Sequence, residues 1–121
     1  MLAGYLASFT SRDIDAISAH VGSEFINTHA SALGDGSVGR DEYRERLPDF
    51  LAMFPGLHYE VEHIIDSDNR AMAAYRMTAN HDGHNIDIRG IMSVVVSDGV
   101  IVSRTDYWDS LTFLRQIDQA P

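Results

Sequence analysis

The second half of the chain contains four strand-like segments in a row, and this feature most restricts the possible folds. The segments are LHYEVEHII (57–65), RAMAAYRMTANH (70–81), NIDIRGIMSVVVS (85–97) and VIVSRTDYWD (100–109). The connecting stretches DSDN, DGH and SDG are rich in Asp, Asn and Gly, which favour tight hairpin turns. Strands joined by such turns pair with their neighbours in the chain, so we predict a four-stranded antiparallel meander.

The first half of the chain is mainly helical. Apolar residues at helical spacing predict helices over 2–9, 13–21, 40–54 and, at the end of the chain, 110–117. Asp13 and Ser110 are the expected N-caps, and Pro48 should kink or divide the third helix. EFINTHA (24–30) is predicted to be a strand, and LGDGSVG (33–39) a loop. The order indicates an α+β fold with helices on one face of the sheet.

The segment NIDIRGIMSVVVS is predicted to be apolar on both faces toward its end. One face carries Ile86, Ile88, Gly90, Met92, Val94 and Val96. Such a strand must be covered twice: by helices on one side, and by a partner subunit or the far wall of a pocket on the other. Gly90 in mid-strand predicts a bulge or sharp curvature. A curved sheet wrapped around helices would form a cone with an interior.

Charge and composition narrow the possible partners. The chain has 121 residues, which suits one domain (1–121), and 18 acidic residues against nine Lys and Arg give a net charge of −9. This charge argues against nucleic acid or an anionic membrane as a partner, and a small neutral or cationic molecule fits better. The chain has no Cys and no apolar window of about 20 residues, and its N-terminus lacks a basic region, so we expect a cytoplasmic protein.

Asp106 is the main candidate for chemistry. Asp is rare in strands, and burying its carboxylate in an apolar, aromatic strand without a partner costs free energy. If buried, it would serve as a general acid or base; otherwise it would cap the last helix or pair with an Arg. Asp109 stands at a helix entrance, where carboxylates are common for structural reasons. Alternation places Asn27 and His29 on one strand face, either toward the pocket or at the surface. Arg76 would bind an oxyanion, hold Asp106 ionised, or form an internal salt bridge.

Other residues have weaker signals. Tyr75, Met92, Tyr107 and Trp108 would line an apolar pocket or build the core and a dimer face. The HDGH stretch at 81–84 contains two possible zinc ligands, but no third ligand has suitable spacing, so we expect no metal.

The whole chain resembles the nuclear transport factor 2-like superfamily, and within it the SnoaL-like polyketide cyclases. The matching stretches are SRDIDAISAHV, FINTH, GSVGRDEYRERLPDFLAMFPGLHYEVEHII, HDGHNIDIRG and DGVIVSRTDYWDSLTFLRQ. The resemblance implies a cone-shaped α+β barrel with a strongly curved, mixed or antiparallel sheet, helices closing a deep pocket, and often a homodimer formed through the sheet. It also implies that no cofactor is needed.

The resemblance places Asp106 where SnoaL-like cyclases have an acid/base aspartate. It is also where limonene epoxide hydrolases, which RTDYWD resembles, have one of two catalytic aspartates. Arg76 matches their Arg, but Thr78 stands in place of the second Asp, and a threonine is not a carboxylic acid. A resemblance to ketosteroid isomerases is weaker, because their base aspartate would fall near His29.

We therefore expect a cofactor-independent cyclase, isomerase or dehydratase that acts by proton transfer on a small apolar carbonyl or polycyclic substrate. The expected catalytic residues are Asp106 and His29. The expected substrate-binding residues are Asn27, Arg76, Thr78, Tyr75, Met92 and Trp108. A binding or assembly module without chemistry is the alternative, in which Asp106 would be exposed or salt-bridged; an epoxide hydrolase is the third possibility.

Overall fold

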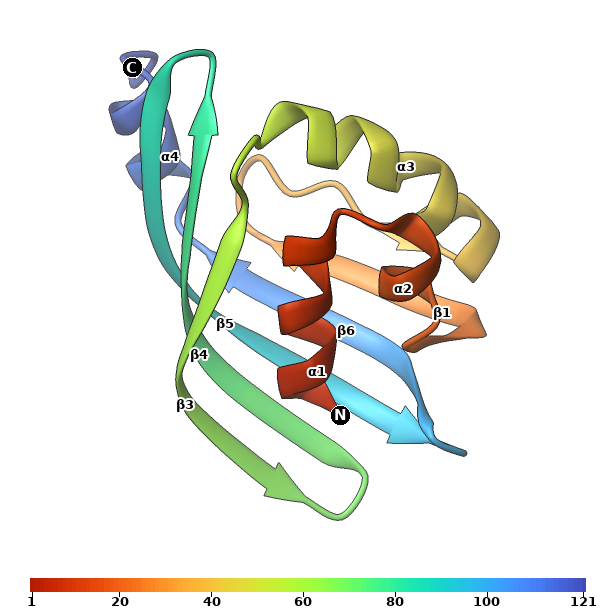
Figure 1. Cartoon of the computed structure of the whole chain (residues 1–121). Helices are drawn as coiled ribbons and strands as arrows, with labels where there is room; N and C mark the ends of the chain where they lie inside the picture. The colour runs from red at the N-terminus through yellow and green to blue at the C-terminus, as the bar shows by residue number, and fades with distance from the viewer.

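The computed structural model describes all 121 residues, as six strands and four α-helices with one 3₁₀ turn (Figure 1). In chain order the elements are α1 (Leu2–Ser8), η1 (Phe9–Ser11), α2 (Ile14–Ser18), β1 (Val21–Ala30), β2 (Ser37–Val38), α3 (Arg40–Met53), β3 (His58–Ser67), β4 (Arg70–His81), β5 (His84–Ser97), β6 (Val100–Trp108) and α4 (Ser110–Gln116).

The strands form one sheet in the order β2-β1-β6-β5-β4-β3. The β3 to β6 meander is antiparallel, as predicted, and β1 adds to it in parallel beside β6, so the sheet is mixed. Figure 1 shows that the sheet is strongly curved and that α1, α2 and α3 lie on its concave side. The predicted α+β cone is therefore confirmed, with its interior between the sheet and these helices.

The core fills this concave side. Ile86, Ile88, Met92 and Val94 of β5, which alternation placed on one face, are buried there. They belong to one hydrophobic cluster that includes Tyr5, Leu6 and Phe9 from the N-terminal segment. Burial of this shared apolar surface holds the helices against the sheet. No helix combines the length and the apolar character that crossing a membrane requires.

The N-terminal boundaries differ from the prediction. The second helix ends at Ser18, and β1 begins at Val21, because Val21 pairs with Ile101 of β6. Inside the predicted loop 33–39, Ser37 and Val38 form β2 by pairing with β1. Both differences result from strand pairing with distant residues, which outweighs local preference.

The helix α3 and the cap of α4 also differ from the prediction. Pro48 does not divide α3, which runs unbroken through it. The proline is on the exposed side of this helix, while Leu47 and Leu51 are buried and hold both halves against the core. At α4 the N-cap is Asp109, whose side chain accepts a hydrogen bond from Leu111 N at 3.0 Å; Ser110 is not the cap. Asp13 caps α2, as predicted.

Candidate functional site

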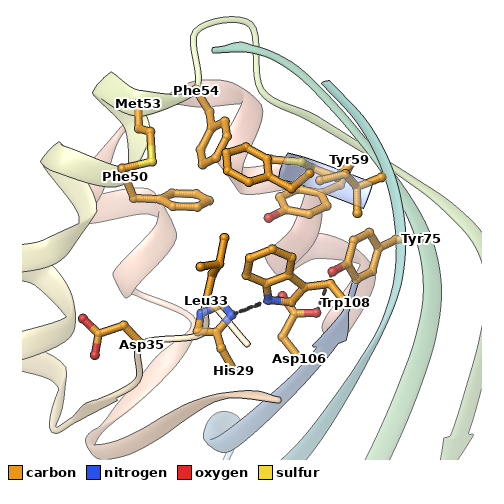
Figure 2. A pocket seen from close by; sticks show the side chains of 13 residues that line it. His29, Leu33, Asp35, Phe50, Met53, Phe54, Tyr59, Tyr75, Asp106 and Trp108 are labelled. Carbon is orange, nitrogen blue, oxygen red and sulfur yellow. Dashed lines mark hydrogen bonds and ion pairs between the residues drawn. The ribbon is translucent and has the colours of Figure 1, made fainter. Parts of the chain in front are cut away.

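A cavity of about 360 Å³ lies between the concave face of the sheet and α3 (Figure 2). Its walls are largely apolar: ten of its 13 lining residues are hydrophobic. The residues are His29, Leu33, Asp35, Phe50, Met53, Phe54, Tyr59, Tyr75, Met77, Ile88, Asp106, Trp108 and Phe113. A mostly apolar, concave space with a few polar groups is the usual form of a small-molecule site.

Asp106 is the carboxylate in the deep part of this cavity, and its side chain is only 4% exposed. Its two oxygens accept hydrogen bonds from different partners. Tyr75 Oη donates to Oδ1 at 2.6 Å, and Arg104 Nη2 donates to Oδ2 at 3.0 Å. His29 Nδ1 lies 3.9 Å from Oδ2. Asp106 is thus one member of a buried ion pair and also faces the cavity.

Arg104 is the ion-pair partner, and the sequence interpretation missed it. It precedes Asp106 by two residues on β6, so both side chains point to the concave face. Arg104 Nη1 donates to Tyr5 Oη at 2.7 Å, and Tyr5 Oη shares a short hydrogen bond with Tyr43 Oη. Burial disfavours the charge of Arg104, but its interactions with Tyr5 and Asp106 hold its pKa well above the ordinary value. The strand period of two is the signal that could have identified it.

His29 faces Asp106 because the two residues pair directly between β1 and β6. Trp108 Nε1 donates to His29 Nδ1 at 3.2 Å, so Nδ1 is an acceptor and Nε2 carries the proton of the neutral ring. Burial lowers the pKa of His29 from 6.5 to about 4, and the nearby Arg104 charge lowers it further than Asp106 raises it. At neutral pH His29 is therefore an uncharged hydrogen-bond donor through Nε2.

Two tyrosine hydroxyls at the cavity also stay protonated. Burial raises the pKa of Tyr75 far above its ordinary value, and the negative charge of Asp106 adds to this effect. Burial likewise raises the pKa of Tyr59. Asp106 thus accepts one hydrogen bond from the neutral Tyr75 hydroxyl and one from the charged Arg104, with the neutral His29 ring nearby. A carboxylate held in this way at a cavity wall is suited to proton transfer.

The structure brings four of the predicted site residues together. Asp106, His29, Tyr75 and Trp108 all line the cavity. Figure 2 shows these side chains close together, with Phe50 of α3 and Phe54, which follows this helix, across the cavity from them. Asn27 lines a neighbouring cavity of about 220 Å³, which shares His29, Asp35, Phe50 and Met53 with the first.

The other three predicted residues do not reach the cavity. Arg76 lies on the outer face of the sheet, where it makes two hydrogen bonds to Asp87 at 2.8 and 2.6 Å. Thr78 shares that face by strand alternation, because Tyr75 and Met77 point inward. Met92 is fully buried in the core and does not line the cavity. Arg76 therefore forms a surface salt bridge with Asp87, and it is Arg104 that pairs with Asp106.

Sequence interpretation also missed most of the apolar wall. Phe50 and Met53 come from α3, Phe54 directly follows this helix, and Phe113 comes from α4. The helical spacing of Phe50 and Phe54 indicated a buried face, but spacing alone cannot separate core from cavity wall. Leu33 and Asp35 lie in the segment between β1 and β2, whose course depends on tertiary contacts.

His81 of the HDGH stretch has a packing role at one end of the cavity. Its ring lies 5.5 Å from the Phe54 ring and 5.4 Å from the Phe113 ring, measured between centroids. Its Nδ1 lies 3.0 Å from the Met53 carbonyl oxygen. These contacts join β4, α3 and α4, so His81 helps to keep the two helices that carry the apolar wall in place.

Comparisons with known proteins give one consistent result. The family model for the SnoaL-like polyketide cyclases matches residues 1–117. Among solved structures, a protein from Catenulispora acidiphila with a ketosteroid isomerase-like fold, crystallised with trimethylamine, has a TM-score of 0.88 at 15% identity and covers 99% of this chain and 92% of its own. A protein from Shewanella denitrificans described as a SnoaL-like polyketide cyclase has a TM-score of 0.86 at 14% identity. The match covers 97% of this chain and 93% of that protein.

A third similar structure, a protein from Streptomyces galilaeus described as a hydroxylase, has a TM-score of 0.79 at 19% identity and covers 99% of this chain and 83% of its own. No sequence among the curated proteins matches the chain. At these identities the solved structures establish the shared fold, and the reaction must be argued from the site.

Proposed function

Because the chain belongs to the SnoaL-like polyketide cyclase family, we propose that it is a cofactor-independent enzyme of the cyclase, isomerase or dehydratase type. The substrate is a small apolar carbonyl or polycyclic compound. The observation that carries this proposal is Asp106, a buried carboxylate that faces a largely apolar cavity, accepts hydrogen bonds from Tyr75 and Arg104, and lies beside the neutral His29 ring. Apolar walls recognise a hydrocarbon framework, and the carboxylate accepts a proton from it.

In the proposed reaction, Asp106 removes a proton from the carbon next to a carbonyl, and the electrons of the broken C–H bond form an enolate. His29 Nε2–H is the donor that stabilises the enolate oxygen, because the ring is neutral at working pH. In a cyclisation the enolate carbon then attacks a second carbonyl carbon, and the resulting alkoxide takes the proton back from Asp106. In an isomerisation, Asp106 returns the proton to another carbon.

Deuterium exchange tests the first step without knowledge of the natural substrate. The probe is 1-tetralone in D₂O, and loss of its α-proton signal is followed by NMR. We expect the protein to accelerate exchange, and Asp106→Asn to reduce the acceleration about 100-fold or more. Asp66→Asn, an exposed carboxylate on β3, is the matched control and should leave the rate unchanged. If 1-tetralone binds in the cavity and Asp106→Asn exchanges it as fast as the unmodified protein, Asp106 is not the base.

A binding module without chemistry is the second candidate, and one specific observation favours it. Asp106 forms a salt bridge with Arg104, and such a pair also satisfies a purely structural role. The similar Catenulispora acidiphila protein was crystallised with trimethylamine. This candidate predicts that 1-tetralone binds without any accelerated exchange, and that Asp106→Asn leaves its affinity unchanged. Epoxide hydrolysis has less support, because Arg76 and Thr78 lie on the outer face, away from the cavity.

We also propose that two copies of the protein form a homodimer through the outer faces of their sheets. This face carries Ile91, Tyr107 and Met72, which are 43%, 50% and 45% exposed. Ile91 pairs with Tyr107 between β5 and β6, so the two side chains are neighbours on one row. Contiguous exposed apolar side chains on a sheet are typical of a protein interface, and a second copy offers the same surface.

A further inference from the structure

Gly90 lies in the middle of β5, and strand irregularity does not explain it. Of the two predicted alternatives, a bulge or sharp curvature, the bulge is absent there: Ala74, Tyr75 and Arg76 of β4 pair in unbroken register with Ile91, Gly90 and Arg89. On its other side Gly90 pairs with Trp108 of β6, also in register. The register shift of β5 occurs at Val95 and Val96. Besides sheet curvature, a mid-strand glycine can mark the close approach of another group.

The space above Gly90 is occupied by the Tyr75 side chain. A Cβ atom at position 90 would lie 2.4 Å from Tyr75 Oη, 2.6 Å from Tyr75 Cζ and 2.8 Å from the Tyr107 carbonyl oxygen. A Cβ atom essentially never comes this close to a non-bonded atom, so any side chain at position 90 would displace the ring. The end of the Tyr75 ring therefore lies directly on the Gly90 backbone.

This contact lets Tyr75 reach across a strand. Tyr75 is on β4 and Asp106 is on β6, with β5 between them. Neighbouring strands are about 4.8 Å apart, so the side chain must span roughly two strand spacings. It does so over Gly90, and its hydroxyl donates to Asp106 Oδ1 at 2.6 Å (Figure 2).

We propose that Gly90 is a positioning residue of the site: by leaving room for the Tyr75 ring, it places the Tyr75 hydroxyl on Asp106. Arg104 then holds the other oxygen of Asp106, so the carboxylate has one fixed orientation toward the cavity. Its relevance to catalysis rests on the proposed function, in which Asp106 is the base. The geometric part of the proposal is independent of that function.

The first test is a spectroscopic signature of the hydroxyl. A tyrosine hydroxyl proton bonded to a buried carboxylate exchanges slowly and appears downfield in the proton NMR spectrum, and its loss in Tyr75→Phe assigns it. We expect Gly90→Ala to lose this signal. Gly22→Ala, a strand glycine whose added Cβ would first meet the Val100 side chain at 3.2 Å, should retain it. A folded Gly90→Ala protein with the signal intact would overturn the proposal.

The second test keeps the proposal falsifiable if Gly90→Ala folds poorly. A phenylalanine at position 75 has no hydroxyl tether to Asp106, so its ring is free to tilt away from an alanine at 90. We expect the loss of melting temperature caused by Gly90→Ala to fall by about half or more in the Tyr75→Phe background. The remainder arises from the Tyr107 carbonyl contact. Equal losses in both backgrounds would mean that Gly90 serves strand geometry alone.

Exchange of 1-tetralone separates the two proposals. Gly90→Ala and Tyr75→Phe should lower the exchange rate by similar factors, and the double variant should be no slower than either, because all three lose the same hydrogen bond. If Asp106→Asn leaves exchange unchanged, the proposed function fails, while the hydroxyl signal still decides the role of Gly90. If Asp106→Asn abolishes exchange but Gly90→Ala keeps both the rate and the signal, only the positioning role fails.

Discussion

His29 should make the stability of the protein depend on pH. Its pKa is about 4 in the folded protein and 6.5 in the unfolded chain, so between these values the unfolded state binds the extra proton. The contribution of His29 to the free energy of unfolding is therefore fully present above about pH 6.5 and is lost as the pH falls toward 4. The expected loss from this residue is about 3 kcal/mol, from 1.36 kcal/mol per pKa unit. Urea unfolding at a series of pH values measures it.

A His29→Gln variant separates this effect from the titration of carboxyl groups. Glutamine does not titrate, so the stability of the His29→Gln variant should change less between pH 6.5 and 4 than that of the unmodified protein. Identical pH dependence of the two proteins would show that His29 is not buried in its neutral form.

The Arg104–Asp106 pair should be costly to break from one side. Both side chains are 4% exposed, so Arg104→Met leaves an uncompensated carboxylate inside the protein. We expect the free energy of unfolding to fall by about 3–5 kcal/mol. The double variant Arg104→Met/Asp106→Leu should regain most of this loss, because no buried charge remains. Urea unfolding of the three proteins is the measurement, and an additive loss in the double variant would contradict the expectation.

At the scale of the element, the Asp109 cap should keep the short helix α4 formed. Asp109 accepts hydrogen bonds from Leu111 N at 3.0 Å and Thr112 Oγ1 at 2.8 Å, and these bonds lower its pKa. We expect Asp109→Ala to make amide hydrogen exchange in 111–116 several-fold faster. Since Phe113 of this helix lines the cavity, the apolar wall should loosen with it.

Ser110→Ala is the matched control for this helix. Ser110 Oγ accepts from Leu33 N at 2.9 Å and donates to Ser31 Oγ at 3.0 Å, so it connects α4 with the segment after β1. Its removal should speed exchange at Leu33 and leave the exchange of α4 nearly unchanged. Equal effects of both substitutions on α4 would mean that Asp109 does not act as the cap.

At the scale of the whole molecule, Ile91→Lys tests the proposed homodimer. Ile91 is 43% exposed in the single chain, so a lysine there leaves the fold intact but places a charge in the middle of the interface. We expect the unmodified protein to be dimeric in light scattering after size-exclusion chromatography, and Ile91→Lys to be monomeric. Leu111→Lys, 39% exposed on α4, should remain dimeric. A monomeric unmodified protein would refute the proposal.

Much of the fold was predictable because it rests on local patterns. The Asp- and Gly-rich turns predicted the meander correctly, and alternation correctly grouped Ile86, Ile88 and Met92 on one face of its third strand. The parallel pairing of β1 with β6 was not predictable in this way. It joins residues such as His29 and Asp106 that are far apart in the chain, and no local pattern encodes such a register.

The site was predictable only in part, for the same physical reason. The sequence by itself determined that Asp106 is an acid within an apolar strand, and that Tyr75 and Arg76 point to opposite faces. Only the tertiary structure decided which face is the inner one, and hence that Arg104 rather than Arg76 pairs with Asp106. It also decided that Gly90 accommodates the Tyr75 ring. A strand specifies alternation locally, but contacts across neighbouring strands depend on register and on curvature, which arise when the whole sheet packs on its helices.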